Sequence, residues 1–320
     1  MARRNKGRDV HGILLLNKPL GLTSNQALQR VKQFFGAKKA GHTGALDPLA
    51  TGLLPICLGE ATKFSQLLLE SDKIYETTAR LGEVRSTGDL EGEVIQTAVV
   101  ADFTLEQVNG VLQRFTGDVE QVPPLFSALK LDGRPLHELA REGLSTEDAI
   151  VIAEKKRRTI RIHSLELEAQ RQDALDLLVH CSKGTYIRTL VEDIGKALEC
   201  GACVTRLHRI ATGPYRPENM IELETLEQLA EGNDLASMEA LLLPMESAIP
   251  DWPCLELSLE EARRIRRGQS VVKAGLNDQP SVQLWACDSG VRQLIGVGRV
   301  RDGEVRSSRV LNIDLVFDAL

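Results

Sequence analysis

Short apolar segments recur along the first 250 residues and predict a β-sheet. Gly12–Leu16 and Leu53–Leu58 are continuous apolar runs, which are typical of strands buried on both faces. Lys73–Leu81 instead alternates, with Tyr75, Thr77, Ala79 and Leu81 on one side, and Ala174–Cys181 is a further predicted strand. These segments predict a sheet that joins distant parts of the chain.

Helical periodicity appears between the predicted strands. Thr23-Ser24-Asn25-Gln26 and Thr104-Leu105-Glu106-Gln107 are capping boxes, and Gly36 is placed to end the first helix. Apolar residues at helical spacing follow the caps and also mark later segments: Ala27, Val31 and Phe34 or Phe35; Ala61–Leu69; Val108, Leu112 and Phe115; and Ile187, Leu190, Val191, Ile194 and Leu198. Strands and helices together predict a mixed α+β fold.

Two segments interrupt this pattern and suggest the domain organisation. Residues 123–152 carry short mixed patches with Gly133, Pro135 and Gly143 as breakers, so we expect an inserted arm. Pro244–Pro253 precedes a helix capped by Ser258 and short strands ending in an Asp302-Gly303 hairpin turn. We therefore expect domains at 1–250 and 251–320, the second small and mostly β.

Composition narrows the class of protein. The 320 residues, 42% of them hydrophobic and 26% charged, can bury a sizeable core. We find no membrane span and no signal-peptide apolar core, so we expect a cytoplasmic protein. The six cysteines have no framework spacing; the Cys200/Cys203 pair has no second pair to complete a zinc site, and we interpret both as ordinary thiols.

The formal net charge of −6 does not favour a nucleic-acid partner, but the basic residues are clustered. The clusters are Arg3, Arg4, Lys6 and Arg8; Lys155, Lys156, Arg157 and Arg158; and Arg263, Arg264, Arg266 and Arg267. Each cluster alone is typical of a solvated face, and three together favour a nucleic-acid partner only modestly.

The segment Gly41–Gly52 is the best candidate for chemistry. Its glycines allow the backbone to approach a ligand closely, and Pro48 pushes Asp47 into an extended conformation. We therefore expect the loop to hold one carboxylate in a fixed position. In an anonymous loop such an aspartate more often builds a turn, and His42 alone more often has a structural role. We find no Walker loop, complete dinucleotide fingerprint, serine elbow or H-E-x-x-H motif.

Four segments, in order, resemble the motifs of the bacterial TruB family of tRNA pseudouridine synthases. They are Asn17–Ser24 (NKPLGLTS), Gly41–Gly52 (GHTGALDPLATG), Tyr75 on its strand, and Cys181–Arg188 (CSKGTYIR). The resemblance runs over nearly the whole chain. Residues 257–311 also resemble the family's C-terminal PUA domain, an RNA-binding module, and 123–152 corresponds to its tRNA-gripping insertion.

The resemblance implies that this protein isomerises uridine-55 in the T loop of tRNA to pseudouridine. Asp47 falls on the family's nucleophile, which acts covalently, and Arg188 on the cation that orients it. The base must be flipped out of the RNA, and Tyr75 falls on the tyrosine that stacks on it. Its hydroxyl is a candidate for proton transfer.

The same resemblance implies roles for further residues. His42, Tyr186 and Leu207 would contact the substrate or line its pocket, whereas Lys18 and Pro19 would support the catalytic loop. Without the resemblance, Tyr75 and Leu207 could equally be core residues, and Tyr186 could cap a helix. The reaction requires neither a metal nor an organic cofactor. The expected partner is the T arm and acceptor end of tRNA, bound by a monomer, with no DNA or membrane involved.

Two positions depart from the family pattern. Phe126 stands where many members have tyrosine, and Ser86 replaces an aspartate that often precedes the Thr87-Gly88-Asp89 turn. Three other functions stay open: a synthase directed by guide RNA and protein partners, a noncatalytic tRNA-binding or folding protein, and an RNA-binding module with an unrelated activity. The compact insertion argues against the first, and the intact Asp47, Tyr75 and Arg188 argue against the second.

Overall fold

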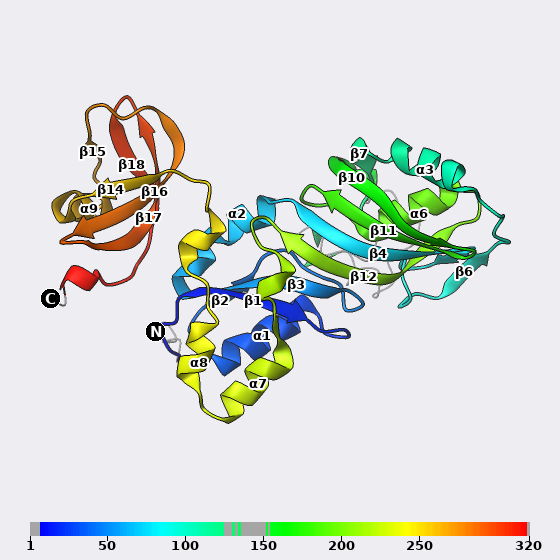
Figure 1. Cartoon of the computed structure of the whole chain (residues 1–320), viewed down its shortest axis with the longest axis horizontal. Helices are drawn as coiled ribbons and strands as arrows, with labels where there is room; N and C mark the ends of the chain where they lie inside the picture. Colours follow the sequence, from blue (N-terminus) through cyan, green and yellow to red (C-terminus); the bar gives the residue numbers. More distant parts are fainter. Residues whose placement is uncertain (1–6, 125–129, 132–133, 136–151, 153, 319–320) are drawn as a thin grey trace.

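A computed structural model describes residues 7–124, 130–131, 134–135, 152 and 154–318. A nine-stranded mixed sheet organises most of this chain (Figure 1). Its order is β13 (Ile221–Glu222), β1 (Gly12–Lys18), β3 (Thr51–Leu58), β12 (Ala202–Thr212), β4 (Lys73–Leu81), β11 (Ala174–Cys181), β10 (Arg158–Arg171) and β7 (Gly117–Gln121), with β2 (Ala40–His42) also paired to β3. The β1–β13 and β3–β12 pairs are parallel and the others antiparallel. The predicted α+β class is confirmed.

The two faces of the sheet bury different cores. Leu14 and Leu16 of β1 belong to a large core that also contains apolar residues of several helices, whereas Ile13 and Leu15 belong to a smaller core on the opposite face. The helices of the large core form two groups (Figure 1). One group lies near β1 and consists of α1 (Ser24–Phe34), α7 (Leu223–Glu231) and α8 (Leu235–Ala240). The other group consists of α3 (Leu105–Arg114), which contacts β10, and α6 (Ile187–Ala197), which packs against β12 and β4. No helix in the described part of the chain is long and apolar enough to span a membrane.

The predicted helix starts are confirmed. Thr23 and Thr104 each accept a hydrogen bond from the backbone N–H three residues on, and Gln26 and Gln107 complete the capping boxes. Gly36 has a φ of +57° directly after the C-cap of α1, which is the left-handed conformation that glycine tolerates best.

Two local predictions were wrong in detail. Ala61–Leu69 is not one α-helix: a 3₁₀ segment, η1 (Gly59–Phe64), leads into a short α2 (Ser65–Glu70). The Thr62 hydroxyl donates back to the Gly59 carbonyl at 2.7 Å, which suits the tighter turn. The predicted loop Gly41–Gly52 is not all loop either. Its first two residues belong to β2, which pairs with β3, and such a short strand carries no periodicity to detect.

The C-terminal residues form a separate five-stranded sheet. Its order is β14 (Cys254–Leu257), β16 (Gln279–Asp288), β17 (Val291–Arg301), β18 (Glu304–Val310) and β15 (Val271–Val272), with α9 (Leu259–Arg266) packed against it. Asp302 and Gly303 both have positive φ in the turn between β17 and β18, so the predicted hairpin is confirmed. Trp285 and Leu294 share the smaller core with Ile13 of the large sheet, and this contact joins the two units.

Most of the predicted insertion at 123–152, including Phe126, lies outside the described residues. Within it, the structure describes a short pair of strands, β8 (Lys130–Leu131) and β9 (Arg134–Pro135).

We predict that Gly52→Ala destabilises the fold far more than Gly117→Ala. Both glycines have a φ near +100° (+100° and +97°), but a Cβ at Gly52 would lie 2.3 Å from the Arg209 carbonyl, whereas one at Gly117 would meet nothing within 4 Å. Backbone strain alone should cost roughly 1–2 kcal/mol at Gly117, and the added clash should bring the cost at Gly52 above about 3 kcal/mol. Urea unfolding of both variants measures this; equal losses would contradict it.

Candidate active site

The loop that carries Asp47 is held at several points. The Gly21 N–H donates to the Pro48 carbonyl at 2.8 Å, which ties the turn after β1 to the loop. The Ser24 hydroxyl at the start of α1 accepts from the Leu46 N–H at 2.7 Å and lies 3.1 Å from the Leu46 carbonyl. Asp47 thus projects from a loop anchored on both sides.

Arg209, on β12, holds the same loop through hydrogen bonds to the backbone. Its side chain is almost completely buried, and it donates to the Leu53 carbonyl at 2.7 Å and the Gly44 carbonyl at 3.1 Å. Because these are charge-assisted hydrogen bonds to backbone oxygens, they fix the path of the loop before Asp47 as well as the strand after it.

Asp47 faces a buried cation. Arg188, at the start of α6, places its Nε 3.0 Å from Oδ2 of Asp47 and 3.7 Å from Oδ2 of Asp89. The side chains of Arg188 and Asp89 are 5% and 2% exposed, whereas that of Asp47 is 41% exposed. Asp47 is therefore the one carboxylate of the two that an external molecule can reach.

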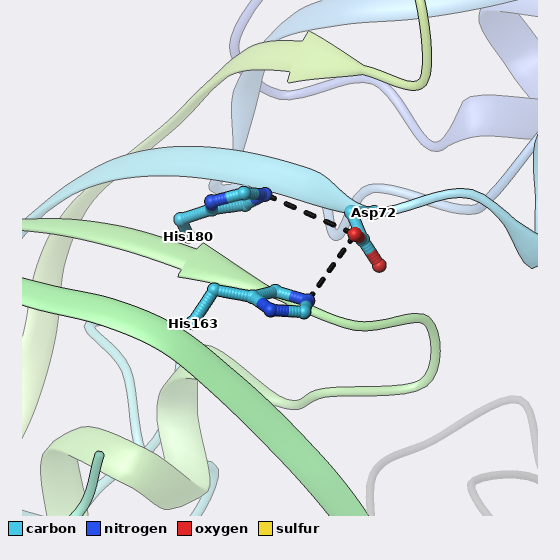
Figure 2. A group of neighbouring side chains, drawn as sticks. All are labelled: Asp72, His163 and His180. Atoms are coloured by element: carbon cyan, nitrogen blue, oxygen red, sulfur yellow. Dashed lines mark ion pairs between the residues drawn. The ribbon is translucent and has the colours of Figure 1, made fainter. Parts of the chain in front are cut away.

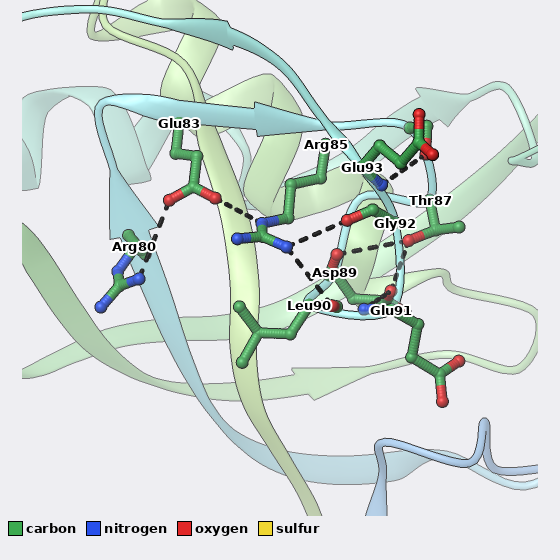
Figure 3. Close-up of polar contacts among 10 residues, drawn as sticks. Arg80, Glu83, Arg85, Thr87, Asp89, Leu90, Glu91, Gly92 and Glu93 are labelled. Atoms are coloured by element: carbon green, nitrogen blue, oxygen red, sulfur yellow. Dashed lines mark hydrogen bonds and ion pairs between the residues drawn. The ribbon is translucent and has the colours of Figure 1, made fainter.

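The loop between β5 (Glu83–Arg85) and β6 (Val94–Thr97) supplies Asp89 (Figure 3). The Thr87 hydroxyl donates to the Asp89 carboxylate, and the Glu91 N–H donates to the same oxygen at 3.1 Å. Arg85 closes the loop by donating to the carbonyls of Leu90 and Gly92, at 3.3 and 2.9 Å. The Arg188 guanidinium also reaches this loop, at the Thr87 carbonyl, over 2.8 Å. Asp89 is thus fixed independently of Arg188 and holds it in place.

The charge state of Asp47 depends on opposing effects. Burial raises the pKa of its carboxyl above the usual range, and Asp89 raises it further, whereas Arg188 and Lys18 lower it. Lys18 is itself fully buried and donates to the Pro19 and Leu22 carbonyls at 2.9 and 2.7 Å, and burial lowers its pKa to about 8. Arg188 thus counteracts the cost of placing a carboxylate in this partly dry position.

A cavity of about 290 Å³ opens over Asp47 and Arg188. This is near the small end of the range for pockets that hold organic ligands, so it suits one nucleoside. Tyr75 and Leu207, both mostly buried, form part of its wall. Burial raises the pKa of the Tyr75 phenol, which keeps the hydroxyl protonated near neutral pH.

Tyr186 and Arg158 lie together at the edge of this cavity. The Arg158 guanidinium stacks 5.2 Å from the centre of the Tyr186 ring, and it also donates to the Gly184 carbonyl. Gln121 holds the Tyr186 backbone through two hydrogen bonds, of 2.7 and 3.0 Å. The edge of the cavity therefore carries both an aromatic face and a positive charge.

The structure brings most of the predicted site residues together. Asp47, Tyr75, Tyr186, Arg188 and Leu207 all line the cavity. His42 does not: it lies on β2, with Nδ1 buried and without a hydrogen-bond partner in the described part of the chain. Lys18 and Pro19 do not line the cavity either; Lys18 is buried and donates to the Pro19 carbonyl.

Sequence reasoning missed four residues of the site. Asp89 could have been suspected from the Thr87-Gly88-Asp89 turn, which is a recognisable signal. Arg209 and Lys73 lie on strands and carry no local signal; Lys73 donates to the Leu68 and Leu69 carbonyls at the end of α2 and lines the cavity, and burial lowers its pKa to about 8. Arg158 was noted only as part of a basic run.

Among the residues described, the one group with three metal-type ligands is Asp72, His163 and His180, outside this cavity.

Three family descriptions match consecutive parts of the chain. They are the TruB family pseudouridylate synthase N-terminal domain at residues 32–187, the tRNA pseudouridylate synthase B C-terminal domain at 188–250, and the pseudouridine synthase II TruB C-terminal region at 253–311. Among curated proteins, tRNA pseudouridine synthase B of a Marinomonas species is 47% identical over 96% of this chain and 97% of its own length. The same enzyme of Nitrosococcus oceani is 48% identical over 97% of both.

Solved structures share the fold at lower identity. A Cbf5–Nop10–Gar1 complex superimposes with a TM-score of 0.68 at 24% identity, covering 94% of this chain and 84% of that one. An H/ACA ribonucleoprotein bound to a substrate RNA gives a TM-score of 0.69 at 20% identity, covering 98% and 92%. These likenesses show the fold alone: a mixed-sheet domain followed by a C-terminal β half-barrel.

The mixed sheet, with an aspartate and a buried arginine meeting in one cavity, belongs to a pseudouridine synthase, an isomerase. Within that class the chain belongs to the TruB family, and its activity is that of tRNA pseudouridine synthase B. The resemblance read from the sequence motifs is confirmed.

The raised pKa of Asp47 predicts a pH-dependent cost to stability. When the pKa of a carboxyl is higher in the folded than in the unfolded state, its ionisation lowers the free energy of unfolding of the protein. The loss develops as pH rises from the unfolded pKa, about 3.9, through the folded value. Asp47→Asn removes this cost, so it should raise the free energy of unfolding more at pH 7.5 than at pH 4. Urea unfolding at the two pH values measures the difference.

Asp176→Asn is the matched control, because the pKa of Asp176 is shifted in the opposite direction to that of Asp47. Hydrogen bonds from Arg171 and Thr78 lower the pKa of Asp176, so the asparagine should lose more stability at pH 7.5 than at pH 4. If both variants changed in the same direction with pH, the assignment of a raised pKa to Asp47 would be wrong.

Proposed function

We propose that this enzyme converts uridine-55 in the T loop of tRNA to pseudouridine, with Asp47 as a covalent nucleophile and without a cofactor. The observation that carries the proposal is the 3.0 Å contact between Asp47 and Arg188 at the wall of a nucleoside-sized cavity. It supplies an accessible carboxylate oxygen, oriented by a cation that cannot itself be deprotonated.

The chemistry exchanges one glycosidic bond for another. A bond from a carboxylate oxygen of Asp47 to the sugar or to the base allows the C1′–N1 bond to break. The released base turns within the cavity, and C1′ then bonds to C5 of the base. C5 loses its proton, N1 gains one, and the carboxylate is regenerated, so the reaction needs no oxidant or second substrate.

The cavity suits a base that has been flipped out of its RNA. Tyr75 offers an aromatic face, and such stacking contributes about 1–3 kcal/mol per base. Leu207 offers an apolar surface on the same cavity, which excludes water from the reacting atoms. Tyr186 and Arg158 at the edge offer stacking and a positive charge to the adjoining nucleotides or phosphates. In this proposal His42 contacts the RNA outside the cavity.

The other parts of the proposal concern domain organisation and tRNA binding. We propose that residues 1–250 form the catalytic domain and 251–320 a PUA-type module for the acceptor end, with 123–152 gripping the T arm. Exposed arginines on α9 and directly after it, including Arg264 and Arg267, support an RNA-facing surface in the second unit despite the net negative charge. The enzyme would act as a monomer.

Position-resolved mapping of pseudouridine in an unmodified tRNA transcript tests the proposal. Wild-type protein should convert the T-loop uridine alone, because one cavity accepts one flipped base. Asp47→Ala should convert none while still binding the transcript, since the side chain contacts no RNA backbone in this proposal. Binding measured in parallel separates lost chemistry from lost recognition.

Asp102→Ala is the matched protein control, because Asp102 is an exposed loop aspartate remote from the cavity, and it should retain full conversion. A transcript with cytidine at position 55 is the RNA control and should yield no product. Turnover by Asp47→Ala would remove Asp47 as nucleophile, and product at another uridine would overturn the assigned position.

A further inference from the structure

Three metal-type side chains converge on the sheet away from the active-site cavity (Figure 2). Asp72 immediately precedes β4, His163 lies on β10, and His180 lies on β11. Nε2 of His163 is 3.2 Å from Oδ2 of Asp72, Nε2 of His180 is 4.0 Å from the same oxygen, and the three ligand atoms all lie within 4.8 Å of one another. Figure 2 shows both rings directed at the carboxylate.

Strand register places these side chains on the face opposite the cavity. Val179, buried in the large core, pairs with Tyr75, and Cys181 pairs with Lys73. His180 lies between them and pairs with Ile74, so it points to the other side of the sheet, as does Asp72 one step before Lys73. The cluster is therefore separate from the site of uridine chemistry.

An irregularity in β10 brings in the third ligand. The pairing of β10 with β11 shifts between Ile162 and Ser164, and His163 is the residue left between them. A bulge of this kind re-aims a side chain, and here the His163 ring centre lies 4.6 Å from that of His180. In a regular strand the two histidines would not both meet Asp72 in this way.

We propose that Asp72, His163 and His180 form a binding site for a divalent transition metal, with Zn²⁺ as the best fit. Two imidazole nitrogens and one carboxylate oxygen are the ligand set that Zn²⁺ accepts, and a tetrahedral ion with bonds of about 2.0–2.2 Å would separate its ligands by about 3.3 Å. The 3.2 Å between His163 and Asp72 already matches this separation, whereas the 4.0 Å between His180 and Asp72 exceeds it. All three side chains are partly exposed, so small rotations can shorten the longer distance.

The surroundings favour binding and leave one position open. The Gly213 N–H donates to the Asp72 carbonyl at 3.0 Å, which fixes the backbone that carries the carboxylate. Three protein ligands leave a fourth position to water, since the cluster faces solvent. The bound ion would tie together the ends of β4, β10 and β11, behind Lys73 at the cavity wall.

Zinc titration of the full-length, untagged protein tests the site, after dialysis against a chelator. Calorimetry should show one equivalent bound by wild type, and Zn²⁺ should raise the melting temperature because it binds only the folded arrangement. His163→Ala and His180→Ala should each lose that equivalent and the thermal shift. His208→Ala is the matched control, because His208 lies on β12 of the same sheet and is not in the cluster, and it should keep both.

Melting temperatures of the metal-free variants exclude simple unfolding as the cause. If an alanine variant melts lower than metal-free wild type, Asp72→Asn replaces it, since the amide keeps the size of the side chain and removes its charge. Absence of zinc binding by wild type would overturn the proposal. Binding that survives in His163→Ala, His180→Ala and Asp72→Asn would also overturn it.

Discussion

A buried guanidinium between two carboxylates is the interaction on which the active site depends. Arg188 lies 3.0 Å from Asp47 and 3.7 Å from Asp89, and both Arg188 and Asp89 are almost wholly inaccessible to solvent. Taking such charges out of water is costly, and their mutual attraction repays the cost only when the geometry is good and other hydrogen bonds are satisfied. The Thr87 hydroxyl and the Glu91 N–H supply those bonds to Asp89, so Arg188 has a fixed support from which to hold the accessible Asp47.

The fold assembles this arrangement from distant parts of the chain. Asp47 comes from the loop before β3, Asp89 from the β5–β6 loop, and Arg188 from the first turn of α6. Arg209 on β12 then ties the catalytic loop to the middle of the sheet. In the proposed mechanism the base is flipped out of the RNA and rejoined through another atom, so the carboxylate must stay in place while the substrate moves. This network would provide that rigidity.

The features of the fold and the site that the sequence predicted are those with a local signal. The capping boxes at Thr23 and Thr104, the alternation in β4 and the Asp302-Gly303 turn each follow from chemistry within a few residues, and the motif around Asp47 identified the family. Other features depend on long-range contacts. The buried roles of Arg209 and Lys73 arise from strand pairing, β2 exists only because β3 lies beside it, and η1 replaces helix at Ala61 where Gly59 turns the chain. The placement of His42 outside the cavity also required the three-dimensional structure.

We propose that Arg188 orients Asp47 because Asp89 holds Arg188. A double-mutant cycle on the single-turnover rate of pseudouridine formation tests it most directly, with wild type, Arg188→Lys, Asp89→Asn and the double variant. If the two residues act as one unit, each change should cost much less once the other is made, with a coupling of at least about 1 kcal/mol. Rate losses that simply multiply would show that Asp89 and Arg188 act independently and would contradict the account.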